Sequence, residues 1–311
     1  MAVKRSRELS RAMRSRLVCG LCLAACATAP PAAAAQRILA ISSADTEPYR
    51  LAMSGMSGLG ASVERFQVAA ERDQAIAGAV ARGGRDTAIV TLGAAAAAAV
   101  AGAKVLSAGV PVVNCMVLGT TPARAGAAIG VPLAIPADVH ATWLRRLLPA
   151  AHTVGILYDP AQNEERAADS VRAMAHAGLA VVAEAVPDPA ALPVALQRMQ
   201  DHVDVLHALP DTTVYNREHA RALLLFSFRQ RIPLVGPTEG WVKAGALFAV
   251  DWDYADLGRY CAALALRQLA GAKGPLPPPP QTRVVVNARS AEQLHIRWDA
   301  QQLQLIDKVY P

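Results

Sequence analysis

The stretch Val203-Asp-Val-Leu-His-Ala-Leu-Pro-Asp-Thr-Thr213 is an apolar run that ends in a cluster of polar side chains. An upstream run from His152 to Tyr158 ends in the same way, in Asp159 and Pro160. Both are typical of a buried strand followed by a helix. In an open parallel α/β sheet, small molecules bind at the carboxyl ends of strands, where helix N-termini and polar loops converge. The two stretches therefore predict a small-molecule cleft at one edge of a parallel sheet.

Two further apolar runs end in polar residues. Pro237-Thr-Glu-Gly240 comes after one run, and Val250-Asp-Trp-Asp253 closes another. Four polar strand ends favour a binding protein more strongly than any single one does.

Runs of strand length alternate with helical stretches along the whole chain after residue 35. Such alternation predicts an α/β fold in which helices cover both faces of parallel sheets. The pattern restarts near residue 135, which predicts two Rossmann-like lobes with hinge crossings between them. We assign residues 36–134 and about 252–273 to an N-terminal lobe. The C-terminal lobe takes residues 135–251 and about 281–311.

The first 35 residues have the layout of a secretory signal peptide. Six basic residues in the first sixteen precede an apolar run from Leu17 to Ala27, and small residues and prolines follow up to Ala35. An apolar run of about ten residues is too short to span a membrane as a helix, which takes about 20. We therefore expect export to the periplasm.

Two cleavage sites compete within this segment. Leu23-Ala-Ala-Cys26 resembles a bacterial lipobox, in which Cys26 becomes the lipid-modified N-terminus. Ala33-Ala-Ala35 resembles an ordinary signal-peptidase site, which gives a mature protein without a lipid. The lipobox is slightly favoured, and membrane contact is expected only through this lipid anchor.

The targeting segment also carries most of the excess positive charge. The whole chain has 31 basic and 25 acidic residues. Residues 1–35 hold six of the basic and one of the acidic residues, so the remainder has a net charge of +1. A nearly neutral mature chain predicts no nucleic-acid partner.

Beyond the signal segment the chain keeps two cysteines. Cys115 falls in an apolar strand and Cys261 in an amphipathic helix. The periplasm would allow them to pair, but their positions in the sequence do not fix their separation in the fold. Buried free thiols are the favoured interpretation over a disulfide.

Signatures of catalysis are missing from the sequence. Ser57 lies in Gly55-Met-Ser-Gly58, but Leu59 occupies the last glycine position of a nucleophile elbow. The sequence has no phosphate loop or nucleotide-binding glycine pattern, and its histidines lack metal-ligand spacing. We expect a binding protein without cofactor or metal, not an enzyme.

Four segments resemble those of one transport family. They are Leu147-Leu-Pro-Ala-Ala-His-Thr-Val-Gly-Ile-Leu-Tyr-Asp-Pro160, Leu209-Pro-Asp-Thr-Thr-Val214, the run from Ile232 to Leu247, and Asp253-Tyr-Ala-Asp-Leu-Gly-Arg259. Together they are similar to the ABC transporter substrate-binding family that includes tryptophan- and phenylalanine/tyrosine-binding proteins. The resemblance extends from Gln36 to about Trp298. It implies the type I periplasmic binding protein fold, a small-molecule ligand and an ABC permease as partner.

The first half of the chain departs from this family. Members that bind amino acids carry a hydroxyl residue after the glycine that closes the third strand, where it helps to hold a carboxylate. Here Gly93 is followed by Ala94 and Ala95, and the loop from Ser42 to Tyr49 is short. The resemblance therefore implies the fold more firmly than an aromatic amino-acid ligand.

The strongest candidate ligand contacts close two strands of the second half. Asp211 can accept hydrogen bonds from a ligand ammonium, and a charge-assisted bond contributes about 1.5–3 kcal/mol. Thr212 and Thr213 beside it are candidate contacts too. The other interpretation of Asp211 is a helix cap or Asx turn, since Thr212 and Thr213 also cap well. Asp159, with Asn163, has the same two interpretations.

Further candidates come from other strand ends and from the first lobe. Glu239 follows an apolar strand, and Gly240 beside it suggests a close backbone approach to a ligand. Asp251 serves either the ligand or the hinge. Tyr49 either stacks on an aromatic ligand or is half-buried structure, and Gly93 closes the third strand.

Two functions are compatible with these features. In the first, the protein is the solute-binding component of an ABC importer and delivers a small molecule to an inner-membrane permease. In the second, the same clamp is an orphan envelope sensor that reports to a membrane receptor or signalling protein. The alanines after Gly93 favour the second function.

Overall fold

A computed structural model describes residues 36–68, 77–79, 81, 84–102, 109–117, 128–273 and 275–311. Residues 35–311 form one compact unit. The predicted signal segment, with Cys26 and both cleavage sites, lies outside the described residues.

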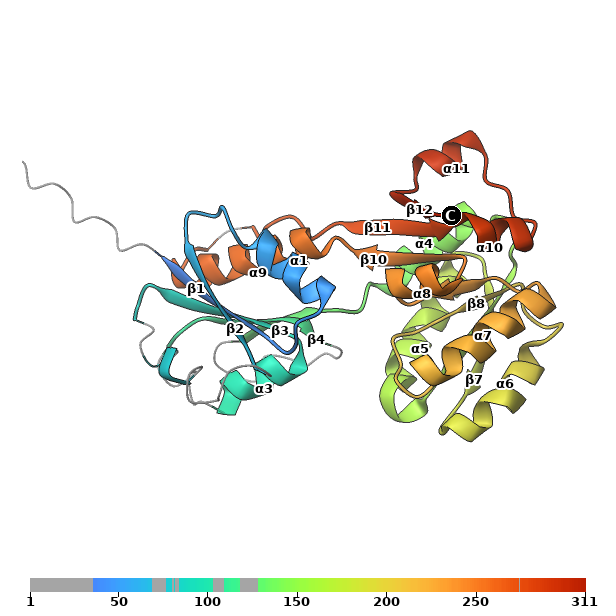
Figure 1. The fold of residues 1–311 in the computed structure, drawn as a ribbon, viewed down its shortest axis with the longest axis horizontal. Helices are drawn as coiled ribbons and strands as arrows, with labels where there is room; N and C mark the ends of the chain where they lie inside the picture. Colours follow the sequence, from blue (N-terminus) through green and yellow to red (C-terminus); the bar gives the residue numbers. More distant parts are fainter. Residues whose placement is uncertain are drawn as a thin grey trace, which may run out of the picture. The chain divides into compact units, whose positions relative to one another are not determined.

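The first sheet is parallel and has helices on both faces (Figure 1). Its elements are β1 (Arg37–Ser42), β2 (Ser62–Gln67), β3 (Thr87–Leu92), β4 (Val112–Val117), β5 (Ala128–Pro132), α1 (Glu47–Gly55), α3 (Ala94–Gly102) and α9 (Tyr254–Leu269). The strand order is β2-β1-β3-β4-β5. All six residues of β3 are buried, because α1 and α9 cover one face of the sheet and α3 packs on the other.

The second sheet has the order β12-β11-β10-β9-β8-β6-β7. Its strands are β6 (Thr153–Tyr158), β7 (Ala180–Ala185), β8 (Val205–His207), β9 (Leu234–Gly236), β10 (Phe248–Trp252), β11 (Thr282–Asn287) and β12 (Lys308–Tyr310). Its helices are α4 (Ala137–Leu147), α5 (Pro160–His176), the 3-10 helix η2 (Pro189–Ala191), α6 (Leu192–Met199), α7 (Arg217–Gln230), α8 (Glu239–Ala244), α10 (Ala288–Gln293) and α11 (Ala300–Gln304).

Alternation of side chains along the second sheet builds two separate cores. Val205 of β8 faces the layer formed by α4, α5 and α10. Leu206 faces the opposite layer, formed by α6 and α7. The sheet is parallel except between β10 and β11, which are antiparallel. The prediction of an α/β fold with parallel sheets flanked by helices is confirmed.

Three crossings connect the two sheets, and hydrogen bonds join them to one another. The indole Nε1 of Trp252, the last residue of β10, donates to the carbonyl of Leu133, after β5 (2.7 Å). The amide of Asp253 donates to the carbonyl of Gln281, before β11 (3.0 Å). The amide of Gln281 in turn donates to Asp256 of α9 (2.8 Å). The three crossings are therefore linked to one another by hydrogen bonds.

The backbones of α1 and α9 touch because each helix has a glycine at the contact. A Cβ on Gly258 of α9 would lie 1.9 Å from the carbonyl oxygen of Ala52. A Cβ on Gly55 of α1 would lie 1.8 Å from the carbonyl oxygen of Ala255. Distances this short exclude any side chain, so α9 fits this face only through the paired glycines.

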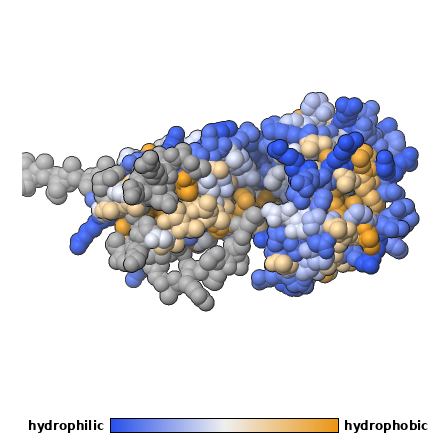
Figure 2. Space-filling model, turned by 60° about the horizontal axis from the view of Figure 1, so that its bottom comes forward, coloured by the Kyte–Doolittle hydropathy of each residue, from blue (hydrophilic) through white to orange (hydrophobic). Residues whose placement is uncertain are grey.

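The surface of the described residues has scattered large hydrophobic side chains, such as Val194 and Leu276. At the right of Figure 2, over the second sheet and its helices, hydrophilic side chains predominate, with hydrophobic ones between them. Scattered hydrophobic residues of this kind are normal on a protein surface. Among the helices of the described part, none has the length and apolar character needed to span a membrane.

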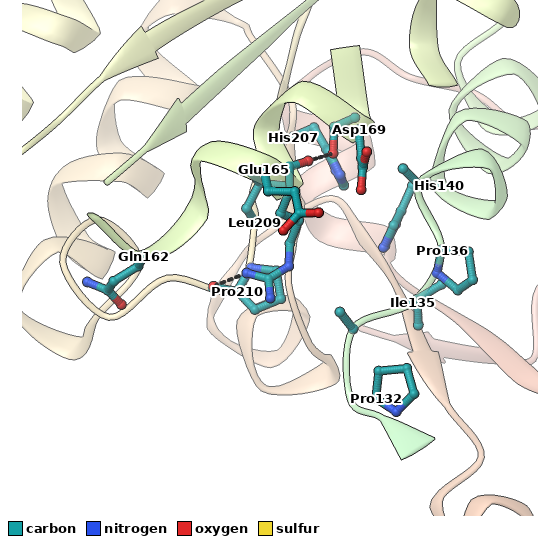
Figure 3. Close-up of a pocket in the computed structure, with 14 residues that line it drawn as sticks. Pro132, Ile135, Pro136, His140, Gln162, Glu165, Asp169, His207, Leu209 and Pro210 are labelled. Atoms are coloured by element: carbon teal, nitrogen blue, oxygen red, sulfur yellow. Dashed lines mark hydrogen bonds between the residues drawn. The ribbon is translucent and has the colours of Figure 1, made fainter. Parts of the chain in front are cut away.

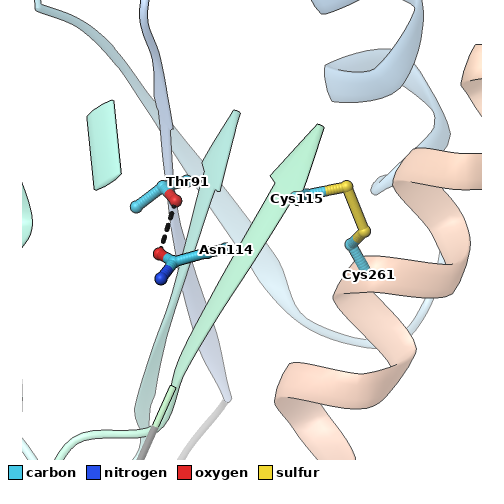
Figure 4. The surroundings of a disulfide bond; sticks show 4 residues. All are labelled: Thr91, Asn114, Cys115 and Cys261. Atoms are coloured by element: carbon cyan, nitrogen blue, oxygen red, sulfur yellow. Dashed lines mark hydrogen bonds between the residues drawn. A yellow bond between two sulfur atoms is a disulfide. The ribbon is translucent and has the colours of Figure 1, made fainter. Parts of the chain in front are cut away.

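Cys115 of β4 and Cys261 of α9 form a disulfide (Figure 4). The favoured interpretation of these residues as free thiols is therefore wrong. They are 146 residues apart in the sequence, yet their Cα atoms are 6.3 Å apart, because α9 returns from the second half of the chain to cover the first sheet. This return is a property of the tertiary fold, and local sequence patterns do not reveal it.

We expect the disulfide to stabilise the protein by about 2–5 kcal/mol, because it restricts the unfolded chain. Urea unfolding with and without reductant measures this difference in the free energy of unfolding. A Cys115→Ser/Cys261→Ser double variant is the control and should unfold identically under both conditions. Alkylation of both thiols in unfolded protein that has never been reduced would contradict the bond.

Candidate functional site

The predicted site residues of the second sheet share one edge of that sheet. Strands β6, β8, β9 and β10 are mutually parallel, so their carboxyl ends open on the same side. Asp159 follows β6, Asp211 follows β8, Glu239 begins α8 after β9, and Asp251 lies within β10. Their side chains form two separate clusters, one around Asp159 and Asp211 and one around Glu239 and Asp251.

Asp211 is buried, and both of its carboxylate oxygens are fully used by the protein. One oxygen accepts from the amides of Thr213 (2.8 Å) and Val214 (2.9 Å). The other accepts from the amide of Asp159 (2.8 Å) and from Nδ2 of Asn163 (2.8 Å). A carboxylate has about four acceptor sites, so little capacity remains for a ligand. The geometry favours the capping interpretation, in which Asp211 shapes the loop after β8 and joins it to β6.

Asp159 caps α5 and keeps more of its acceptor capacity. Its Oδ1 accepts from the amide of Ala161 (2.9 Å), and its Oδ2 accepts from Thr213 Oγ1 and Gln162 Nε2, each at 2.7 Å. These bonds, led by those from Thr213 and Gln162, lower the pKa of Asp159. The carboxylate is therefore ionised at neutral pH and holds the side chains of Gln162 and Thr213 in place.

The cluster presents Gln162 and Thr212 to solvent, with Thr213 half-buried beside them. Gln162 Oε1 accepts from the Thr212 hydroxyl at 2.8 Å, while its Nε2 donates to Asp159 and Thr213. A molecule at this edge would first meet these amide and hydroxyl groups and only then the carboxylates. The sequence reasoning missed Gln162; its position three residues after the capping Asp159 was the available signal.

Asn163 lies beneath this layer and is buried. Its Nδ2 donates to Asp211 and to the carbonyl of Pro210 (3.2 Å), and its Oδ1 accepts from Arg166. Like Asp211, it joins the end of β6 to the end of β8.

Glu239 belongs to the second cluster. Its carboxylate accepts from Lys308 Nζ (2.8 Å) and from the Tyr310 hydroxyl, both in β12, and Lys243 lies 3.6 Å away. Burial raises the pKa of Glu239, but the bonds from Lys308 and Tyr310 outweigh this effect and the net shift is downward. A Cβ on Gly240 would contact only the Thr238 hydroxyl at 3.5 Å, so no described part of the chain requires a glycine there.

Asp251 lies where β10 becomes a crossing, and it organises that crossing. Its carboxylate accepts from the amides of Glu239 (2.9 Å) and Trp252 (2.8 Å) and from the Tyr254 hydroxyl (2.7 Å). Burial raises the pKa of Asp251 against the lowering effect of these bonds. Because Tyr254 begins α9, the contacts favour the hinge interpretation of Asp251.

The candidates of the first sheet meet at the ends of β1 and β3. Gly93 has φ +90°, and a Cβ there would lie 2.4 Å from the Tyr49 hydroxyl and 2.7 Å from Ser43 Oγ. Ser43 Oγ accepts from the amide of Ala96 (3.0 Å), in the first turn of α3. The hydroxyl that is missing at Ala94 and Ala95 is thus supplied at the same helix terminus by Ser43.

The structure brings Asp159, Asn163, Asp211 and Thr213 into one network and places Tyr49 against Gly93. Within the described residues, no hydrogen bond joins the Tyr49–Gly93 pair to that network or joins Glu239 to Asp211. The described part of the chain also has no group of three side chains suited to a metal ion.

A model of the family described as ABC transporter substrate binding protein matches residues 61–310. No curated protein matches the chain. A ligand-free, open substrate-binding protein with adhesive properties from Clostridium difficile is 17% identical, with a TM-score of 0.69 over 88% of this chain and 99% of that one.

Two other solved structures have similar folds. An ABC domain in complex with L-Trp from Streptococcus pneumonia has 19% identity and a TM-score of 0.60 over 88% of this chain and 99% of its own. A sugar-binding protein of a sugar ABC transporter from Bacillus halodurans has 16% identity and a TM-score of 0.59, over 85% of this chain and 100% of its own. At these identities the likeness establishes the fold alone.

Replacing Asp211 with alanine should lower the free energy of unfolding by about 3–5 kcal/mol, because four donors around a buried carboxylate lose their acceptor. Thr212→Ala, which changes the exposed neighbour, should alter it by less than about 1 kcal/mol. Urea unfolding of both variants beside the parent protein measures the contrast. Equal stability of Asp211→Ala and Thr212→Ala would refute a structural role for Asp211.

Proposed function

Because the chain belongs to the ABC transporter substrate-binding protein family, we propose that it captures one small molecule between two lobes and delivers it to an ABC permease. The lobes are those predicted from the sequence, and Trp252, Asp253 and Gln281 lie in the crossings about which they would close. Closure follows binding only if the ligand has a higher affinity for the closed state, and so it needs contacts from both lobes.

The observation that carries this proposal is the ordered layer of Gln162, Thr212 and Thr213 above Asp159. All three side chains are already held by hydrogen bonds within the protein. Groups fixed before binding lose little conformational entropy when a ligand arrives. A layer of amide and hydroxyl groups suits a polar ligand with both donors and acceptors.

The first sheet supplies a different set of groups. Ser43 Oγ and the first turn of α3 suit a carboxylate, since amides at a helix N-terminus favour negative charge. The half-buried Tyr49 ring beside them suits an aromatic side chain. We propose an aromatic amino acid as the first ligand to test, and the L-Trp complex of the pneumococcal protein supports this choice.

The proposal includes the cellular setting. The protein works in the periplasm after removal of residues 1–35, or is held at the membrane by a lipid on Cys26. The Cys115–Cys261 disulfide supports an oxidising compartment. The second candidate function is an orphan envelope sensor; the alanines at positions 94 and 95 support it, whereas the Ser43 hydroxyl at the same helix terminus supports capture of a ligand.

We expect L-Trp to bind with micromolar affinity, about −8 kcal/mol, and to stabilise the protein by about 2.7 kcal/mol at a hundred times Kd. Calorimetric titration and thermal unfolding measure the two effects. Gln162→Ala and Ser43→Ala should each weaken binding about tenfold, because each removes a hydrogen-bonding group from one lobe.

Thr142→Ala is the matched control, because Thr142 is an exposed α4 residue whose hydroxyl donates to the Asp138 carbonyl. It should leave the affinity unchanged. A response to other amino acids alone would change the ligand, whereas no response to any amino acid or sugar would favour the sensor.

A further inference from the structure

A cavity of about 350 Å³ lies between α4, α5 and the crossing that follows β5. Figure 3 shows His140, His207 and Asp169 at one end of the space and Pro132 and Ile135 at the other. Its volume falls within the range of small-molecule sites. Of the ordered layer formed by Gln162, Thr212 and Thr213 (the strand-end layer), Gln162 alone lines this cavity.

Two histidines in this cavity lack hydrogen-bond partners among the described residues. His207 of β8 is 1% exposed, and neither of its ring nitrogens is bonded. His140 of α4 is half-buried, but its Nδ1 is enclosed and equally unbonded. The ring centroids are 4.7 Å apart. Buried polar atoms are rarely left unbonded, because each one costs about 1–3 kcal/mol.

Both rings are neutral at neutral pH. Burial lowers the pKa of His140 to about 4 and also lowers that of His207, whose neighbour His140 adds to the effect. A neutral imidazole has one donor nitrogen and one acceptor nitrogen. Together the rings therefore match a group that can donate and accept at once, such as a hydroxyl.

The charged residues that line the cavity are two carboxylates and one guanidinium, which leaves an excess of one negative charge. Glu165 and Asp169 of α5 supply the carboxylates and are exposed, beside the half-buried Arg166. Arg166 already donates to Asn163 and to the carbonyl of Pro210, at the limit of bonding distance (3.5 Å). Arg172, which is exposed and does not line the cavity, bonds to only one oxygen of Asp169.

The remaining walls are apolar and suit a short hydrocarbon chain. Pro132 and Ile135 come from the crossing and Leu209 from the segment after β8. A metal ion is not favoured, because the described residues hold no group of three suitable side chains.

We propose that this cavity is a second binding site, which takes a short amino alcohol with its ammonium at Glu165 and Asp169 and its hydroxyl at the two imidazoles. The site is additional to the strand-end layer and does not depend on the proposed transport function. One wall is the crossing after β5, so an occupant contacts a segment that moves if the lobes close.

The test uses 4-amino-1-butanol as the probe and the mature chain labelled with 15N at histidine. Long-range 1H–15N spectra follow the His140 and His207 rings during the titration. We expect saturable shifts of both rings. The neutral analogue 1,4-butanediol should bind about tenfold more weakly, because it lacks the charge-assisted bond.

Two variants test the role of the carboxylate charges without disturbing buried residues. Asp169→Asn and Glu165→Gln change exposed side chains, and each should bring the affinity for 4-amino-1-butanol closer to that for 1,4-butanediol. Glu218→Gln, an exposed carboxylate of α7 outside the cavity, is the matched control and should bind like the parent protein. Ser43→Ala should also bind the amino alcohol normally, even if it loses the strand-end ligand.

Equal affinity for the two probes would overturn the proposal, as would an unchanged affinity in both carboxylate variants. If the ring signals of His140 and His207 shifted with Zn²⁺ but not with 4-amino-1-butanol, the pair would be a metal site and the proposal would fail. Failure of L-Trp to bind leaves this test intact, because the readout comes from His140 and His207.

Discussion

The hydrogen bonds among the three crossings constrain everything else in this protein. The Trp252 indole holds the crossing after β5, and the Asp253 amide holds the one before β11. Asp251 adds a buried carboxylate that joins the start of α8 to the start of α9. If the proposed lobes close, dihedral changes in the crossings must keep these bonds or break them.

The cluster around Asp159 and Asp211 contains both buried and exposed residues. The hydrogen bonds of Asp211 and Asn163 hold the loop after β8 and join it to the end of β6. Gln162 and Thr212 remain accessible above them. Substitution of this exposed pair would leave the bonds between Asp211 and Asn163 in place.

Much of the fold could be predicted from the sequence, because buried parallel strands and their capping residues leave local patterns. The α/β prediction is confirmed, and Asp159 and Asp253 cap helices directly after strands. The disulfide could not be predicted, since the approach of Cys261 to β4 depends on how α9 packs. Helix α8, at Glu239–Ala244, was not expected, because six residues carry too little periodicity.

For the candidate site, position was easier to predict than role. The strand ends that hold Asp159, Asp211 and Asp251 lie at the same edge of the sheet because β6, β8, β9 and β10 are parallel. Whether a carboxylate faces a ligand or its own backbone depends on loop geometry that the sequence does not specify. The His140–His207 pair lies outside any sequence signal, because its members come from different layers.

The return of α9 to the first sheet has a consequence for biosynthesis. The apolar face of β1, β3 and β4 is covered only in part, by α1, until Leu269, the last residue of α9, has been synthesised. By then the strands from β6 to β10 of the other sheet are already available to pair. The N-terminal strands are thus synthesised first but buried last, and during that interval the part of their apolar face that α9 will cover is exposed.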